Sequence, residues 1–96
     1  MNEVEFTWDP KKAASNARKH GVTFEEAASV FLDENARIIE DVAHSKDEDR
    51  FILLGISGGL RLLVVVHCLR QDDQEIRIIS ARRASKKEHK QYGSFI

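Results

Sequence analysis

The polar residues best suited to chemistry lie in the last third of the chain, beside segments rich in apolar residues. Arg70, Glu75 and Arg77 flank a short polar turn, and Ser80 and Arg82 follow at close spacing. An arginine fork grips two phosphate oxygens at once, whereas a carboxylate accepts a proton and a hydroxyl orients a reacting group. Cleavage of RNA without a metal ion requires such groups, because the 2′-hydroxyl must lose a proton and the phosphate must be stabilised by cations.

A simpler interpretation is available for the same residues. In it, Glu75 pairs with Arg70 or Arg77 as an ordinary cross-strand salt bridge, which is worth about 0.2–1 kcal/mol. The residue types alone leave both interpretations open.

Basic residues elsewhere are candidates for contacts with a substrate. Lys19 and His20 precede Gly21, where a cation is favoured at the end of a helix or can reach a phosphate. Lys86 belongs to a basic run that either follows a phosphodiester backbone or forms a solvated surface. As a hypothesis, we assign Lys19, His20 and Lys86 to substrate binding.

No metal site and no cofactor are expected. The histidines do not fall at the i,i+4 spacing of a helical metal site, and no cluster of Cys and His is present; they are His20, His44, His67 and His89. The single cysteine, Cys68, lies inside an apolar run and is expected to be a small buried side chain.

The composition indicates a single soluble domain that spans residues 1–96. Of the 96 residues, 42% are hydrophobic and 32% are charged, and no apolar run approaches the ~20 residues needed to cross a bilayer. The first residues lack the features of a secretory signal, so we expect a cytoplasmic protein without membrane contact. Residues 1–50 hold seven Lys/Arg and twelve Asp/Glu, whereas residues 51–96 hold eight and four. The basic half is either a footprint for nucleic acid or an unevenly charged solvated surface.

Local signals predict an α+β protein with the order β-α-α-β-β-β-β-α and helices packed on a mostly antiparallel sheet. Asp9 and Pro10 begin the first helix and Gly21 ends it, and a capping-box pattern from Thr23 to Glu26 begins the second. The expected strands are 4–8, 37–40, 50–57, 60–69 and 75–82, and the expected helices are 10–20, 24 to about 33–35, and 84–92, with a loop at 41–49.

Alternation along the last two strands divides their polar residues between two faces of the sheet. One face is expected to carry a charged corner formed by Arg70, Glu75 and Arg77. The other face is expected to carry a second corner with the following members: Arg61, His67, Ser80 and Arg82.

Three groups of residues follow one another along almost the whole chain. The first is Phe6, Trp8-Asp9-Pro10, Lys12, Asn16, Lys19-His20-Gly21-Val22, Phe24, Glu26-Ala27, Val30-Phe31 and Asp33. The second is His44-Ser45, Glu48 and Arg50, and the third is Ile76-Arg77-Ile78-Ile79-Ser80-Ala81-Arg82 with Ala84, Glu88 and Tyr92. Their order and spacing together resemble the BrnT family of toxins from type II toxin–antitoxin systems.

This resemblance implies a RelE/ParE-like fold and a metal-independent RNA endonuclease that inhibits translation. It also implies a BrnA-like antitoxin that neutralises the toxin and binds DNA. Through that antitoxin the toxin would meet operator DNA, in a heterotetramer of two toxins and two antitoxins.

By position, the family's active groups correspond to Arg70, Glu75, Arg77, Ser80 and Arg82 in this chain. We expect Arg77 and Arg82 to stabilise phosphate charge and Arg70 to position the substrate. Ser80 is expected to orient the scissile group, and Glu75 is the candidate proton acceptor.

Two alternatives come from other functional classes. In one, the domain is a non-catalytic module that binds the antitoxin and acts as a co-repressor. In the other, it is a toxin that inhibits a topoisomerase, as ParE-like folds sometimes do. The first predicts tight partner binding without RNA cleavage, and the second predicts DNA damage with intact RNA.

Overall fold

The computed structural model describes residues 3–39 and 50–93 of the chain. Its elements are β1 (Glu5–Thr7), α1 (Pro10–His20), α2 (Phe24–Ser29), the 3₁₀ helix η1 (Val30–Leu32), β2 (Arg37–Ile39), β3 (Arg50–Ile56), β4 (Leu62–Arg70), β5 (Glu75–Arg83) and α3 (Lys86–Gly93). The α+β class and the element order predicted from the sequence are confirmed. The predicted loop at 41–49, with His44-Ser45 and Glu48, lies outside the described residues.

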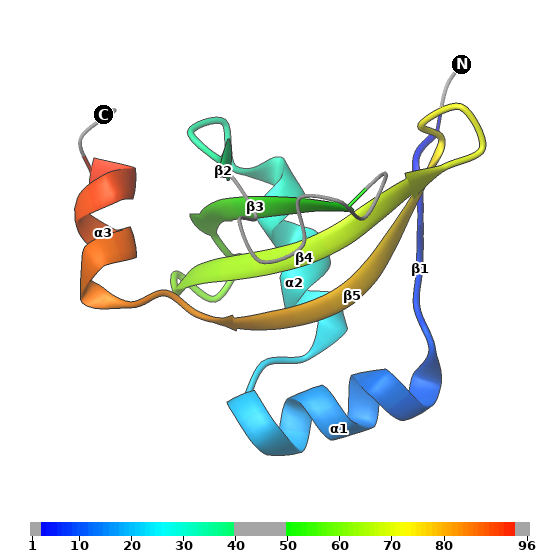
Figure 1. Cartoon of the computed structure of the whole chain (residues 1–96), viewed down its shortest axis with the longest axis horizontal. Coiled ribbons are helices and arrows are strands. Elements are labelled where there is room, and N and C mark those ends of the chain that lie inside the picture. Colours follow the sequence, from blue (N-terminus) through cyan, green and yellow to red (C-terminus); the bar gives the residue numbers. More distant parts are fainter. Residues whose placement is uncertain (1–2, 40–49, 94–96) are drawn as a thin grey trace.

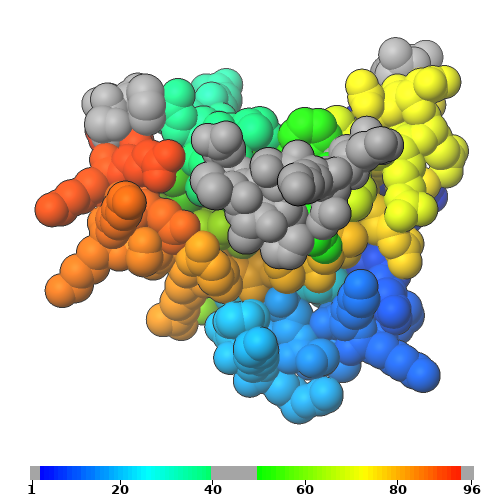
Figure 2. Space-filling view, in the orientation of Figure 1, coloured from blue at the N-terminus to red at the C-terminus, as the bar shows by residue number. Residues whose placement is uncertain are grey.

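The strands form one five-stranded sheet in the order β1-β5-β4-β3-β2. The β1 strand runs parallel to β5, and the other neighbouring pairs are antiparallel. Figure 1 shows α1 alongside β5 beyond the end of β1, and α3 at the end of β5 far from β1. In the same orientation, Figure 2 shows α1 (blue) along the lower edge of the molecule, next to β5 (orange).

The helix boundaries follow from local capping chemistry. The Asp9 side chain accepts a hydrogen bond from the Lys11 amide at 2.9 Å, and Gly21 ends α1 in a left-handed conformation with φ of 69°. The Thr23 hydroxyl caps α2 by accepting from the Glu26 amide at 3.1 Å. The helical segment reaches Leu32, but its last turn tightens into η1, so the α-helical part is shorter than predicted.

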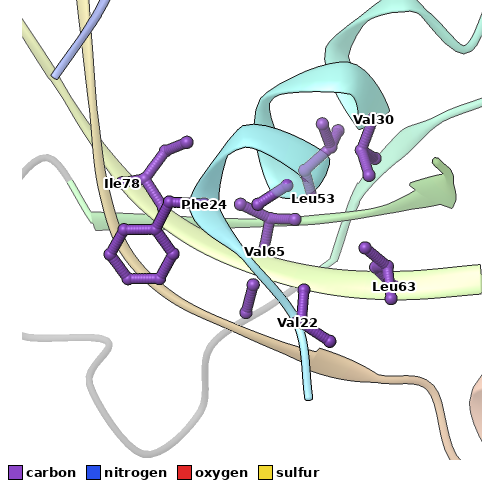
Figure 3. Packing of buried hydrophobic residues seen from close by; sticks show 9 residues of the cluster. Val22, Phe24, Val30, Leu53, Leu63, Val65 and Ile78 are labelled. Carbon is purple, nitrogen blue, oxygen red and sulfur yellow. The ribbon is translucent and has the colours of Figure 1, made fainter. Parts of the chain in front are cut away.

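The two faces of the sheet carry separate apolar clusters. Beneath α1 and α2 lies the larger one, made of Val22, Phe24, Ala27, Val30, Leu53, Leu63, Val65, Ile78 and Ala81. Figure 3 shows its close packing around α2. On the opposite face, Tyr92 of α3 packs with Leu54, Leu62 and Val64. The α3 helix therefore covers only part of that face, and the rest of β5 on this face is left for polar residues.

The Asp33 carboxylate ties three elements together near the end of β3. Its Oδ2 accepts from the Ile56 amide at 2.8 Å and from the Tyr92 hydroxyl at 2.7 Å. Burial and this hydrogen bond raise the pKa of Tyr92 to about 12, so the hydroxyl stays protonated as a donor. Close approach of η1 and β3 requires Gly55, because a Cβ there would lie 2.8 Å from side-chain carbons of Val30 and Ala36.

The prediction that Ser80 and Arg82 lie on the face opposite Arg77 is wrong, because β5 contains a β-bulge. Arg77 pairs with Cys68 and Ile78 with His67, but Val66 then pairs with Ser80, so Ile79 is an extra residue. Because directly opposed residues share a face, Ser80 lies on the face of Arg77 and not on the opposite face.

The same shift moves Arg82 to the face of Arg77, since Arg82 is opposite Val64. Between Ser80 and Arg82, the side chain of Ala81 points into the core, and this residue is only 1% exposed. A small apolar side chain thus fills the core position that uninterrupted alternation would have given to a serine or an arginine.

The predicted second charged corner does not exist. Arg61 pairs with Glu26 of α2 instead. His67 is 2% exposed and its ring contacts those of Phe31 and Phe51. Burial lowers the pKa of His67, which keeps the imidazole neutral in the core.

Candidate active site

All five predicted catalytic residues lie on one face of the sheet. Along β5, the residues on this face are Glu75, Arg77, Ser80 and Arg82, and Arg70 is opposite Glu75. Their partners on β4 run from Arg70 to Val64, a span of six residues or roughly 20 Å. The site is therefore a line along one strand and not a compact corner.

The Glu75 end of the line is a hydrogen-bonded network. Thr7 Oγ1 donates to Glu75 Oε2 at 2.6 Å, and Gln71 Nε2 donates to Glu75 Oε1 at 2.7 Å. These two hydrogen bonds, with the charges of Arg70 and Arg77, hold the pKa of Glu75 below its ordinary value. The carboxylate is thus ionised at neutral pH and oriented by both of its oxygens.

Sequence reasoning missed Thr7 in this network. The parallel pairing of β1 with β5 places Thr7 beside Arg77, a contact between residues 70 positions apart. Within residues 3–39 and 50–93, Glu75 accepts hydrogen bonds from neutral groups and forms no ion pair with Arg70 or Arg77. The cross-strand salt bridge of the simpler interpretation is therefore not observed among these residues.

The guanidinium of Arg77 is much less engaged by its surroundings than that of Arg82. Among the described contacts, its Nη1 donates only to Thr7 Oγ1, at a long 3.4 Å. Arg77 is level with Cys68 on the adjacent strand β4 and with Arg50 on β3, the strand beyond it, so the backbones of the two arginines lie two strand spacings, roughly 10 Å, apart. Cys68, expected to be buried, is partly exposed in this row.

Arg82 is engaged by α3. Its Nη1 and Nη2 donate to the two carboxylate oxygens of Glu88, both at 2.9 Å. Glu88 also accepts from the Ser85 amide at 2.8 Å, and the Ser85 hydroxyl accepts from the Glu88 amide, which forms a capping box at the start of α3. These bonds, that to Arg82 foremost, lower the pKa of Glu88 to about 2. Arg82 thus anchors α3 while its charge is largely compensated.

A hollow of about 200 Å³ lies between α1 and the bulge of β5. It is lined by Lys12, Ser15, Asn16, Lys19, His20, Ile79 and Ser80. The spacing of its α1 residues, at i, i+3, i+4, i+7 and i+8, puts them on one helix face. The hollow therefore brings two predicted substrate-binding residues, Lys19 and His20, next to the predicted catalytic Ser80.

The third predicted substrate-binding residue, Lys86, lies away from the hollow. Lys86 is exposed on the first turn of α3 and does not line the hollow. No role was predicted for Lys12 and Ser15, although their helical spacing from Lys19 is visible in the sequence.

In the described ranges, no three His, Cys, Asp or Glu side chains gather to hold a metal ion. None of the helices described is long and apolar enough to span a bilayer.

Comparisons with known proteins place this arrangement in a family. The family described as "Ribonuclease toxin, BrnT, of type II toxin-antitoxin system" matches residues 8–88. The crystal structure of the Brucella abortus ribonuclease toxin BrnT is similar with a TM-score of 0.67 and 24% sequence identity, over 86% of this chain and 99% of that chain. A comparison with curated proteins gave no match.

The structural similarity confirms the predicted fold class, which is consistent with a RelE-like architecture. The family match extends over most of the chain and includes α1, the bulge and the start of α3. The family is described by ribonuclease activity, and a type II system implies an antitoxin partner. The chain belongs to the BrnT family of ribonuclease toxins from type II toxin–antitoxin systems.

Proposed function

We propose that this chain is a metal-independent RNA endonuclease that inhibits translation by cutting RNA along the outward face of β5. The observation that carries the proposal is the bulge at Ile79, which sets Ser80 beside Arg77 on one face. Arg77 and Ser80 are level with Cys68 and Val66, two residues or roughly 7 Å apart on β4. A phosphate between them is within reach of both side chains.

In the proposed reaction, the 2′-hydroxyl oxygen attacks the adjacent phosphorus and the bond to the 5′-oxygen breaks. Glu75 accepts the proton of the 2′-hydroxyl, and the 5′-oxygen takes a proton from solvent. Arg77 stabilises the charge on the phosphate oxygens, because a guanidinium donates to two of them at once. The products are a cyclic 2′,3′-phosphate and a free 5′-hydroxyl.

The remaining residues of the line hold the substrate. Arg70 positions the strand at the Glu75 end. Arg82 adds charge at the other end, with a smaller share than Arg77 because Glu88 occupies its fork. Lys86 extends the basic surface onto α3.

The hollow between α1 and β5 supports a second contact with the substrate. Lys19 and His20 are placed by the end of α1 next to Ser80. We assign them to the phosphate of a neighbouring nucleotide, because contacts with the phosphate backbone position a strand without reading its base sequence.

The partner in this proposal is a BrnA-like, DNA-binding antitoxin that neutralises the toxin in the cytoplasm. Two toxins and two antitoxins form a heterotetramer, which reaches operator DNA through the antitoxin. The type II family supports the existence of an antitoxin, and this assembly is our extension of it.

Inducible expression in a bacterial host, with and without the neighbouring gene, tests the proposal, together with mapping of RNA 5′ ends. We expect growth arrest and new cuts with 5′-hydroxyl ends, both relieved by the neighbour, and cleavage by purified protein that persists in a chelator. Arg77→Ala is expected to lower cleavage at least about 100-fold, and Arg82→Ala less. Arg18→Ala, an exposed cation on α1 outside the hollow, is the control.

Cleavage by Arg77→Ala within a few-fold of the unaltered protein overturns the assignment of that residue. Intact RNA with tight antitoxin binding supports the co-repressor instead. DNA damage with intact RNA supports topoisomerase inhibition.

A further inference from the structure

The edge of β5 changes its neighbour halfway along the strand. The β1 strand pairs with β5 only as far as Thr7, which is opposite Arg77. Past that point, in the part of the chain that the structure describes, no strand continues β1, and α1 lies there instead (Figure 1). The backbone of β5 after the bulge therefore has no strand partner on this side, and its buried groups need other hydrogen-bond partners.

Asn16 of α1 supplies those partners. The residue is 7% exposed, and its Nδ2 donates to the Ala81 carbonyl at 2.8 Å while its Oδ1 accepts from the Ala81 amide at 3.1 Å. Nδ2 also donates to the Val22 carbonyl at 3.0 Å. The primary amide thus replaces one residue of a neighbouring strand, and both of its N–H groups are used.

These hydrogen bonds hold Ala81, and the orientation of Ala81 determines which face Ser80 and Arg82 occupy. Ala81 lies between Ser80 and Arg82, immediately after the extra residue Ile79. A strand that slipped by one residue to remove the bulge would turn Ser80 and Arg82 toward the α2 side and expose Ala81. By holding both backbone groups of Ala81, Asn16 stabilises the bulged register.

The same side chain also sets the position of α1 against the strand. Lys12 and Lys19 are four and three residues from Asn16 and line the same hollow. The distance from these cations to Ser80 therefore depends on the hydrogen bonds between Asn16 and Ala81.

We infer that Asn16 is a positioning residue for RNA cleavage: its amide clamps the bulge of β5, so that Ser80 faces the substrate beside Arg77 and opposite the cations of α1. Asn16 touches no reacting atom in this role and acts through Ser80 and its neighbours. The inference depends on the proposed ribonuclease function of the same face.

Steady-state cleavage of a short RNA tests the inference with Asn16→Ala, Ser80→Ala and the double variant. Val30→Ala is the matched control, because it removes buried methyl groups from η1, away from the bulge. All proteins are compared at a temperature at which circular dichroism shows them folded. Asn16→Ser, which keeps one hydroxyl donor, replaces Asn16→Ala if the alanine variant does not fold.

We expect Asn16→Ala to lower kcat about 10- to 100-fold, the scale of a reacting group misplaced by about 1 Å. In the Ser80→Ala background the same change is expected to cost less than about threefold, because the two residues act as a unit. Val30→Ala is expected to leave kcat nearly unchanged in both backgrounds. By amide hydrogen exchange, the Ala81 amide is expected to be protected in the unaltered protein and in Val30→Ala, and to lose that protection in Asn16→Ala.

Three results would overturn the inference. One is a folded Asn16→Ala (or Asn16→Ser) protein with kcat close to that of the unaltered protein. Another is an equal loss in both backgrounds, which would show that Asn16 supports the fold and not Ser80. The third is an unaltered protein that leaves RNA uncut, which separates failure of the proposed function from failure of the clamp and removes the basis of both.

Discussion

Arg77 and Arg82 show how neighbours give two residues of the same type different roles. Glu88 binds both terminal nitrogens of Arg82, whereas Arg77 makes one long hydrogen bond to Thr7. A guanidinium that already grips a carboxylate must release it before it grips a phosphate, and this costs the bidentate interaction. Arg77 pays no such cost, so it is the stronger candidate for the scissile phosphate.

The protonation of Glu75 gives a prediction at the residue scale. The largest cause of its lowered pKa is the hydrogen bond from Thr7, which favours the ionised form. Removal of this donor in Thr7→Val therefore raises the pKa of Glu75. Because the proton acceptor must be ionised, the acid limb of the pH profile of kcat/KM is expected to move to higher pH.

The Thr7→Ser variant is the control for this shift, since it keeps the hydroxyl that donates to Glu75. Its profile is expected to match that of the unaltered protein. If Thr7→Val leaves the acid limb where it was, Glu75 is not the group that titrates in the reaction.

Features of an element that depend on nearby residues could be predicted from the sequence, whereas features that depend on distant contacts could not. Both ends of α1 and the start of α2 were predicted correctly, because Asp9, Gly21 and Thr23 cap the helices through hydrogen bonds to residues only a few positions away. The pairing of Arg70 with Glu75 also followed from a short turn. The bulge was missed because its partner, Asn16, is 65 residues away from Ala81. Alternation along β5 alone carries no sign of that contact.

The other errors have the same origin. The placement of Thr7 beside Glu75 depends on a parallel pairing between the two ends of the chain, and His67 was assigned to a polar corner although aromatic rings bury it. Residue types singled out Glu75, Arg77, Ser80 and Arg82 as candidates, but only the tertiary contacts determined that they share one face of the sheet.

The docking of α3 gives a prediction at the element scale. The pKa of Glu88 falls from an ordinary 4.5 to about 2 in the folded protein, so its interactions with Arg82 and, to a smaller extent, Ser85 stabilise the fold above about pH 4.5. As the pH falls from 4.5 towards 2, this contribution is lost. After allowance for solvent screening, it is worth about 1–2 kcal/mol of unfolding free energy.

Denaturant unfolding across this pH range measures the contribution. Glu88→Gln is expected to lower the free energy of unfolding at pH 7 by about 1–2 kcal/mol and to flatten its decline below pH 4.5. The control is Glu34→Gln, at an exposed position between η1 and β2. An unfolding free energy that declines as steeply in Glu88→Gln as in the unaltered protein would contradict this account.

At the scale of the whole molecule, cations from distant parts of the chain gather around β5. Arg70 and Arg77 come from the last hairpin, Lys12 and Lys19 from α1, and Lys86 from α3. The formal net charge of the chain is only −1, so attraction of RNA must come from this local arrangement and not from overall charge.

The salt dependence of RNA binding tests this arrangement. If those five cations neutralise phosphates of a single strand, log K is expected to fall with log[salt] with a slope of about −3 to −4. Fluorescence anisotropy with a 2′-deoxy-substituted oligonucleotide measures the slope without cleavage. Arg77→Ala and Lys19→Ala are each expected to make the slope shallower by about 0.7, because each releases one counterion fewer.

Arg18→Ala, on α1 outside the hollow, is expected to leave the slope unchanged. A slope that Arg18→Ala and Lys19→Ala reduce equally would mean that RNA is attracted to α1 as a whole. The hollow would then have no special part in binding. A slope near zero would mean that the strand does not lie along β5, because binding along five cations without release of counterions is not physically consistent.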